Sequence, residues 1–135
     1  NAEALRQRLI DAEQTEAACA ADLLQRCQGQ PELLTCKMLA EAAAAGNRMA
    51  EEIFRRATQT LGWAIAQMIA LVGPQVVVIG GGVPQSGEQV FFAPLRAEVN
   101  RYVFPPLLGT FQIVPAALGQ EVAVHGALAL ARTSP

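Results

Sequence analysis

Hydrophobic residues recur at three- and four-residue spacing along most of the chain, and this pattern predicts a helix-rich protein. A first helix is expected over Glu3–Gln28, where helix formers dominate and Gly29 supplies a stop. Proline suits the first position of a helix, so a second one is expected over Pro31–Ala45. Gly46 closes it, and Asn47 is a good N-cap for a third.

The third helix has the most regular pattern and should run from Arg48 to Val72, about 37 Å at 1.5 Å per residue. Its buried face is expected to be one apolar stripe: Met49, Ile53, Ala57, Leu61, Ile65, Met68 and Val72. The i,i+4 pairs Glu51–Arg55 and Glu52–Arg56 indicate a solvated opposite side. Gly62 costs about 1 kcal/mol relative to alanine in mid-helix, which indicates that a neighbouring backbone lies close.

Four consecutive apolar residues, Val76–Ile79, predict a short strand after Pro74. A half-exposed strand would alternate polar and apolar residues, so this one is expected to be buried on both faces. Three glycines follow it and favour a tight turn. Because they lack Cβ atoms, a nucleotide or another flat ligand could approach the backbone, which makes the candidate binding residues Gly80, Gly81, Gly82 and Val83. The alternative is a loop that needs positive φ and binds nothing, since the run is neither G-x-G-x-x-G nor a P-loop.

The remaining pattern predicts another helix, a second strand and a final helix. A helix should begin at Pro94 and bury one face, made of Leu95, Val99, Tyr102 and Val103. The second strand is expected over Phe111–Val114, and the alternation of helix and strand implies a right-handed parallel crossover. The final helix, residues 121–131, holds the single histidine, His125. No Ser or Cys is placed to use it, so no general base is predicted.

Length, charge and cysteine usage exclude several classes. The 135 residues suffice for one domain, and no apolar run approaches the ~18 residues of a membrane span. A net charge of -2 without a basic cluster argues against nucleic-acid binding by this segment. Cys19, Cys27 and Cys36 lack zinc-site spacing, so they are expected to be buried thiols, and a reducing, cytoplasmic location is predicted.

The order and spacing of short motifs resemble the C-terminal part of the ROK family, sugar kinases and sugar-responsive repressors on the actin-like ATPase (ribonuclease H-like) fold. The matching segments lie between Ala45 and Ala131: Ala45–Asn47 with Ala50, Leu61-Gly62, Pro74, Val78–Val83, Pro94-Leu95, Pro115–Gly119 and Gly126-Ala127. The resemblance implies a helix-rich α/β fold with a short parallel strand pair packed by helices. It also implies that Gly80, Gly81 and Gly82 lie against the adenosine of ATP.

The same resemblance implies phosphoryl transfer from ATP to a sugar hydroxyl, with an aspartate as general base and Mg²⁺ bridging the phosphates. The family's Asp-x-Gly-Gly-Thr phosphate loop, zinc motif, catalytic aspartate and sugar-binding residues are absent. Asn47 stands where aspartate is common, which is expected to cost little because both are N-caps. Gly73 stands where asparagine is common.

The chain is therefore expected to be a partial domain, residues 1–135, from a longer protein whose N-terminal lobe lies elsewhere. Residues 1–46 would be N-terminal helices and residues 47–135 the nucleotide-side α/β portion of a glucokinase-like kinase. Such a fragment would be inactive alone; ATP and Mg²⁺ are expected as cofactors of the parent protein, and the fragment is expected to require neither. The alternatives are the sensor and dimerisation portion of a ROK repressor, or a stand-alone helical scaffold. Open strand edges predict a homo-oligomer.

Overall fold

The structure, a computed structural model, describes residues 2–119 and 122–133, with side chains described for residues 14–119 and 124–132. Its main elements are α1 (Ala2–Arg26), α2 (Cys36–Ala44), α3 (Arg48–Val72), β1 (Val76–Ile79), α4 (Ala93–Tyr102), β2 (Gln112–Pro115) and α5 (Val122–Thr133). Short 3₁₀ turns form η1 (Pro31–Leu33), η2 (Val83–Ser86) and η4 (Pro105–Leu107), and a π-helical turn forms η3 (Glu88–Phe92).

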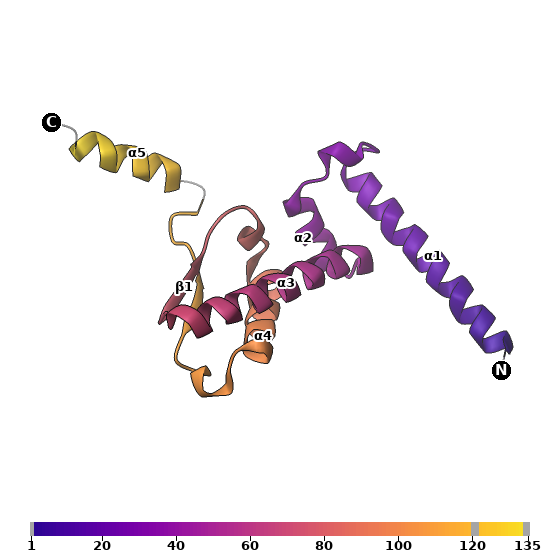
Figure 1. The fold of residues 1–135 in the computed structure, drawn as a ribbon. Helices are drawn as coiled ribbons and strands as arrows, with labels where there is room; N and C mark the ends of the chain where they lie inside the picture. Colours follow the sequence, from indigo (N-terminus) through magenta and orange to yellow (C-terminus); the bar gives the residue numbers. More distant parts are fainter. Residues whose placement is uncertain (1, 120–121, 134–135) are drawn as a thin grey trace.

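Helix α3 is the rod around which the other elements are arranged (Figure 1). Helix α2 lies against its first half and α4 packs beside it, while α1 and α5 extend toward opposite ends of the molecule. Strands β1 and β2 pair in parallel, in a register that aligns Val76 with Gln112 and Ile79 with Pro115. The predicted helix-rich α/β fold with a parallel strand pair is confirmed, and the pair argues against a purely helical scaffold.

The bounds of α3 match the prediction because both ends carry local capping signals. The side-chain oxygen of Asn47 accepts hydrogen bonds from the backbone N–H groups of Met49 (3.1 Å) and Ala50 (3.2 Å). At the other end Gly73 adopts φ +61°, and its N–H donates to the Ile69 carbonyl at 2.9 Å. Helix α3 thus begins and ends where the sequence alone indicated.

The predicted start of α2 at Pro31 is wrong. Only one 3₁₀ turn forms there, and α2 begins at Cys36, five residues later. Thr35 is extended (φ −95°, ψ 159°), and its hydroxyl oxygen accepts the N–H of Met38 at 3.2 Å. A threonine N-cap therefore sets the start of the helix, in preference to proline at the first position.

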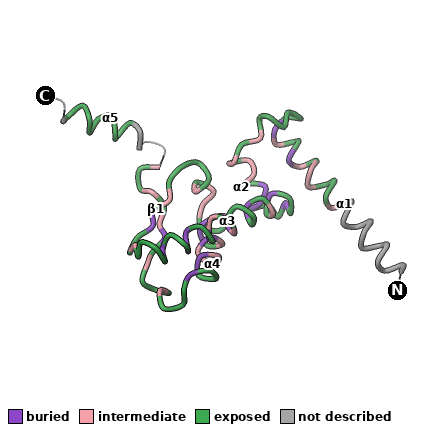
Figure 2. Tube along the Cα trace, viewed as in Figure 1, coloured by how far each residue is buried: buried purple, intermediate pink, exposed green. Residues whose placement is uncertain are grey.

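The predicted buried face of α3 is also wrong, by about one residue along the helix. The residues that it buries are Ala50, Phe54, Thr58, Gly62, Ile65, Ala66 and Ile69. Of the predicted stripe only Ile65 is buried, and Met49, Ile53, Met68 and Val72 are exposed, Val72 by 74%. Figure 2 shows buried and exposed positions alternating along α3.

The close packing of α3 on α4 explains this choice of face. A Cβ atom on Gly62 would lie 2.7 Å from the Cβ of Glu98 and 3.2 Å from the backbone N of Val99. The face that carries this glycine is the one that lets the two backbones approach, as the sequence predicted for Gly62.

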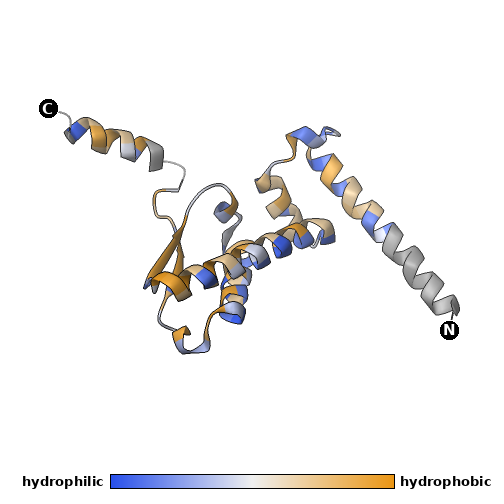
Figure 3. Ribbon diagram, viewed as in Figure 1, coloured by the Kyte–Doolittle hydropathy of each residue, from blue (hydrophilic) through white to orange (hydrophobic). Residues whose placement is uncertain are grey.

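Strand β1 is buried on one face only, which corrects the prediction for both. Val77 is buried with Ile113 of β2 in the core, whereas Val76 and Val78 are 51% and 61% exposed. The described residues form a sheet of two strands, and the helices that complete its core cover one side. The apolar character of β1 is visible along its whole length (Figure 3).

Smaller differences concern the remaining elements. Helix α4 begins one residue before Pro94, and Leu95, Val99 and Val103 are buried as predicted, but Tyr102 is exposed. The second strand lies one residue later than expected, and the final helix begins at Val122, while Glu121 lies outside the described residues.

The three thiols are free, but only one is buried, so the prediction of three buried thiols is wrong. Cys27 is buried and its Sγ–H donates to the Leu23 carbonyl at 3.2 Å, while Cys19 and Cys36 are half-buried. Cys19 and Cys36 lie on the cavity-facing sides of α1 and α2. None of the helices in the described part of the chain has the length and apolarity needed to cross a membrane.

Candidate functional site

The glycine corner, Gly80 to Gly82 at the end of β1, is exposed to solvent. Gly81 has φ +108°, a conformation that side chains with a Cβ rarely adopt. A Cβ atom built on Gly81 or Gly82 would meet no other atom within 4 Å. These two positions therefore have open space in front of the backbone, which a flat ligand needs.

Gly80 has a different role in the corner. A Cβ on this residue would lie 3.3 Å from the Cβ of Ala116, in the loop that follows β2. Beside it the N–H of Ala116 donates to the Ile79 carbonyl at 2.9 Å, which extends the strand pairing by one bond. Gly80 thus packs the corner against its neighbouring loop, and Gly81 and Gly82 face outward.

A cavity of about 600 Å³ borders the corner, between α2 and the segment after β1. Gly82 lines it, whereas Gly80, Gly81 and Val83 do not. The other lining residues are Thr35, Cys36, Lys37, Ala40, Glu41 and Ala44 from α2 and its N-cap, and Gln85, Ser86 and Val90 from η2 and η3. This volume lies within the range of ordinary small-ligand sites.

The α2 wall of the cavity was not predicted from the sequence. It reaches the corner through contacts between residues far apart in the chain, such as Cys36 Sγ, which lies 3.8 Å from the Ser86 hydroxyl. The wall adds one cation, Lys37, and one carboxylate, Glu41, to a corner that otherwise offers backbone groups. Lys37 is the only lysine in the sequence, which could have marked it as a candidate. No periodic pattern around it, however, indicates that it lies near the glycines.

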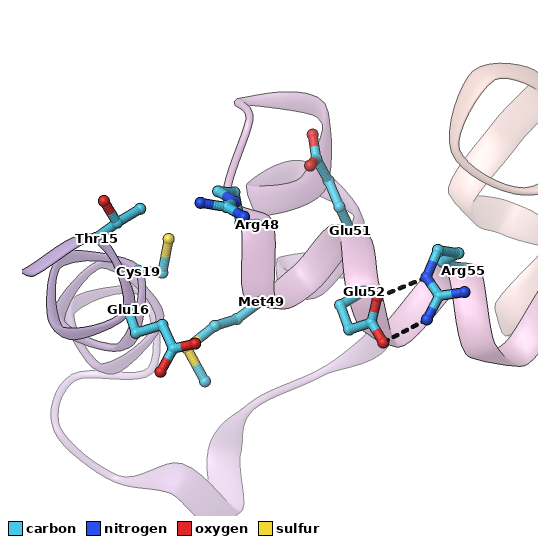
Figure 4. A pocket seen from close by; sticks show the side chains of 8 residues that line it. All are labelled: Thr15, Glu16, Cys19, Arg48, Met49, Glu51, Glu52 and Arg55. Carbon is cyan, nitrogen blue, oxygen red and sulfur yellow. Dashed lines mark hydrogen bonds and ion pairs between the residues drawn. The ribbon is translucent and has the colours of Figure 1, made fainter. Parts of the chain in front are cut away.

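A second cavity, of about 480 Å³, lies between α1 and α3, away from the glycines (Figure 4). Two of its charged side chains pair with each other: Arg55 donates to both Glu52 oxygens at 2.6 Å. Arg56, which does not line this cavity, also donates to Glu52, at 2.7 Å. Arg55, and then Arg56, lower the pKa of Glu52 to about 2.

These contacts settle the two charge pairs predicted on α3. The Glu52–Arg56 pair is confirmed. Arg55 instead binds Glu52 and Gln59 and does not pair with Glu51. No group of three or more His, Cys, Asp or Glu side chains among the described residues could hold a metal ion, at either cavity.

Comparison with known protein families gives a match over nearly the whole chain. The profile of the ROK family matches residues 14–134. A glucokinase of Thermotoga maritima is 34% identical over 110 residues, which cover 82% of this chain and 34% of that protein. A glucokinase of Halalkalibacterium halodurans is 30% identical over 94 residues, 70% of this chain and 28% of that protein. The chain thus spans about a third of the length of these curated relatives.

A solved structure shows the same arrangement of elements. It is a ROK family glucokinase from Streptomyces griseus in complex with glucose and AMPPNP, 30% identical in sequence. It superposes with a TM-score of 0.71 over 91% of this chain, which corresponds to 40% of that chain. The fold described above is therefore similar to part of a nucleotide-binding and sugar-binding protein.

Proposed function

The chain belongs to the ROK family, and on that premise we propose that it is the nucleotide-side, C-terminal portion of an ATP-dependent, glucokinase-like sugar kinase. The observation that carries the proposal is the exposed glycine corner beside a cavity of about 600 Å³. The relatives named glucokinase, and the neighbour with glucose and AMPPNP, support it. Three free thiols support a reducing, cytoplasmic location for the protein.

In the proposed reaction the corner positions ATP, and the rest of the kinase supplies the chemistry. Adenosine would lie against the backbone of Gly81 and Gly82, where the absence of Cβ atoms leaves room for its rings. Phosphoryl transfer depends mainly on holding donor and acceptor in line and on neutralising charge, so this anchoring is a direct contribution to the rate.

The acid–base and metal functions are assigned to the other lobe. Both aspartates of the chain, Asp11 and Asp22, lie on α1, and Asp22 is engaged by Arg26 and Asn47. The described residues do not form a metal-ligand cluster, so they do not fit a Mg²⁺ site of their own. Mg²⁺ in the whole kinase would bind phosphate oxygens and residues of that lobe. Residues 1–46 would then be helices that support the nucleotide side, residues 47–135.

The 135-residue chain is expected to bind ATP weakly, and calorimetric or NMR titration can measure this binding. Replacing Gly81 with leucine is expected to abolish it. The added side chain would fill the open space in front of the backbone and would be strained at φ +108°. Gly109→Leu is the matched control, because Gly109 also has positive φ (+78°) and open space around it. It lies in the turn before β2, at the end of the parallel strand pair opposite the glycine corner.

The outcome separates the two family functions. Unchanged titration by the Gly81→Leu variant would remove the corner as the site. Absence of ATP binding by the wild-type chain would favour the alternative, the sensor and dimerisation portion of a ROK repressor, which keeps the corner only as architecture.

The isolated chain is expected not to phosphorylate glucose in the presence of ATP and Mg²⁺. It holds one wall of the proposed cleft, and the one carboxylate among the residues that line the cavity is Glu41, which we assign to the nucleotide and not to the sugar hydroxyl. A coupled assay for ADP release measures this directly. Turnover above the glucose-free background would overturn the assignment of the catalytic groups to another lobe.

We also propose that the isolated chain self-associates. Val76 and Val78 on β1 and Val72 at the end of α3 expose apolar side chains, and the two-stranded sheet of the described residues leaves strand edges unpaired. Sedimentation at about 100 µM is expected to give a dimer or larger species. A single monomeric species at that concentration would contradict this expectation.

A further inference from the structure

In the nucleotide site proposed above, the glycine corner would contact the adenosine part of the ligand. Its open positions, Gly81 and Gly82, offer backbone groups without a charged side chain. A nucleoside triphosphate carries several negative charges, and a cation beside the same cavity would favour binding it over adenosine.

Lys37 is the one cationic side chain among the residues that line this cavity. It is exposed, in the first turn of α2, and it forms no ion pair with a described residue. The other cations near the body of the fold are engaged or lie elsewhere. Arg55 and Arg56 bind Glu52, Arg96 binds Glu88 and the Ile113 carbonyl, and Arg48 lines the second cavity.

Lys37 and Glu41 give the α2 wall of the cavity opposite charges at its two ends. Glu41 follows Lys37 by four residues, so both side chains lie on one face of the helix, separated by one turn, and both line the cavity. Phosphate is attracted to the Lys37 end and repelled from the Glu41 end, while a carboxylate can accept hydrogen bonds from ribose hydroxyls. The pair therefore favours a nucleotide whose phosphates lie toward the start of α2.

Resting on the nucleotide site proposed above, we propose that Lys37 contacts the phosphates and makes this site select nucleoside di- and triphosphates over nucleosides. Lys37 then acts on binding by charge, and the glycine corner acts by shape. The two contributions separate when ligands with and without phosphate are compared on the same protein.

The test titrates ATP and adenosine into the 135-residue chain by NMR at fixed ionic strength. Lys37→Ala is expected to weaken ATP binding about ten-fold and adenosine binding less than two-fold, since a hydrogen bond to a charged group is lost only for ATP. Lys37→Arg should retain most of the ATP affinity. Arg48→Ala is the matched control, because Arg48 is also an exposed cation in the first turn of a helix but lines the other cavity. It should change neither affinity by more than two-fold.

Each alternative result has a definite meaning. If Lys37→Ala leaves ATP affinity unchanged, or weakens ATP and adenosine equally, Lys37 is not the phosphate contact, and the adenosine site at the corner stands. If the wild-type chain binds neither ligand, the proposed nucleotide site itself fails. Amide spectra of each variant that overlay on the wild-type spectrum away from α2 establish that the fold is intact.

Discussion

Replacing Gly62 with alanine is expected to lower the free energy of unfolding by about 2 kcal/mol, even though alanine is the better helix former. The new methyl group would lie 2.7 Å from the Glu98 Cβ and 3.2 Å from the backbone of Glu98 and Val99. Backbone atoms cannot rotate away, so α3 and α4 must separate along the packed face that holds Phe54, Leu95 and Val99. Overpacking costs about 1 to 3 kcal/mol, and a 2.7 Å contact backed by backbone atoms belongs at the upper end of that range. A cost of about 3 kcal/mol, less the ~1 kcal/mol gained in helix propensity, leaves a net loss of about 2 kcal/mol.

Chemical denaturation monitored by circular dichroism measures the effect. Gly126→Ala is the matched control, because Gly126 also lies inside a helix, α5, and a Cβ there would meet nothing within 4 Å. That variant should be neutral or slightly stabilised. A Gly62→Ala chain as stable as the wild type would show that α3 and α4 do not approach as closely as described.

Replacing Asn47 with alanine is expected to destabilise the chain by about 3 kcal/mol. The buried side chain caps α3 through two backbone N–H groups, and its amide donates to the Cys19 carbonyl (2.9 Å) and to an Asp22 carboxylate oxygen (2.8 Å). Loss of an N-cap costs about 1 kcal/mol, and loss of bonds to buried or charged groups adds a similar amount each. The same residue joins α1 to the rest of the fold, so α1 should detach first.

Thermal and urea unfolding of the variant measure this loss, with Thr35→Ala as control. Thr35 is also an N-cap, of α2, but it is exposed and makes one 3.2 Å bond, so its loss should cost about 1 kcal/mol or less. Equal effects of the two substitutions would mean that the contacts of Asn47 with α1 contribute nothing to stability.

The contacts of Asn47 also correct the expectation that asparagine and aspartate are nearly equivalent at this position. The difference was expected to cost little, because both residues cap helices well. In the structure the Asn47 amide donates a hydrogen bond to Asp22. The hydrogen bond from Arg26 has the largest effect on the Asp22 carboxyl and that from Asn47 the second largest, and both hold its pKa below the ordinary value. An aspartate in this place would face a second carboxylate without a donor, so asparagine and Asp22 belong together here.

Features with short-range causes could be predicted from the sequence. The bounds of α3 follow from Asn47 and Gly73, each of which acts within four residues of the helix end. The parallel strand pair follows from Val76–Ile79 and from a helix between the two strands. Close packing at Gly62 could be inferred because a glycine in the middle of a helix weakens it, which indicates that the position needs a residue without a Cβ atom.

Features that depend on residues far away in the sequence could not be predicted from the sequence. The stripe through Met49, Ile53 and Met68 is as apolar as the buried one, and only the position of α4 decides which faces the core. Exposure of Val76 and Val78 depends on how many layers cover the sheet. The α2 wall of the candidate site meets the glycine corner across about 45 residues of chain, which no local pattern encodes.

The most direct test of an adenosine site at the glycine corner is to titrate ATP into the ¹⁵N-labelled chain and follow each backbone amide. Saturable shifts should be largest at Gly81, Gly82 and the first turn of α2, and adenosine should reproduce those at the glycines. The proposed site is contradicted if the largest shifts fall around Cys19 and Arg48–Arg55 at the second cavity, or if no amide shifts at millimolar ATP.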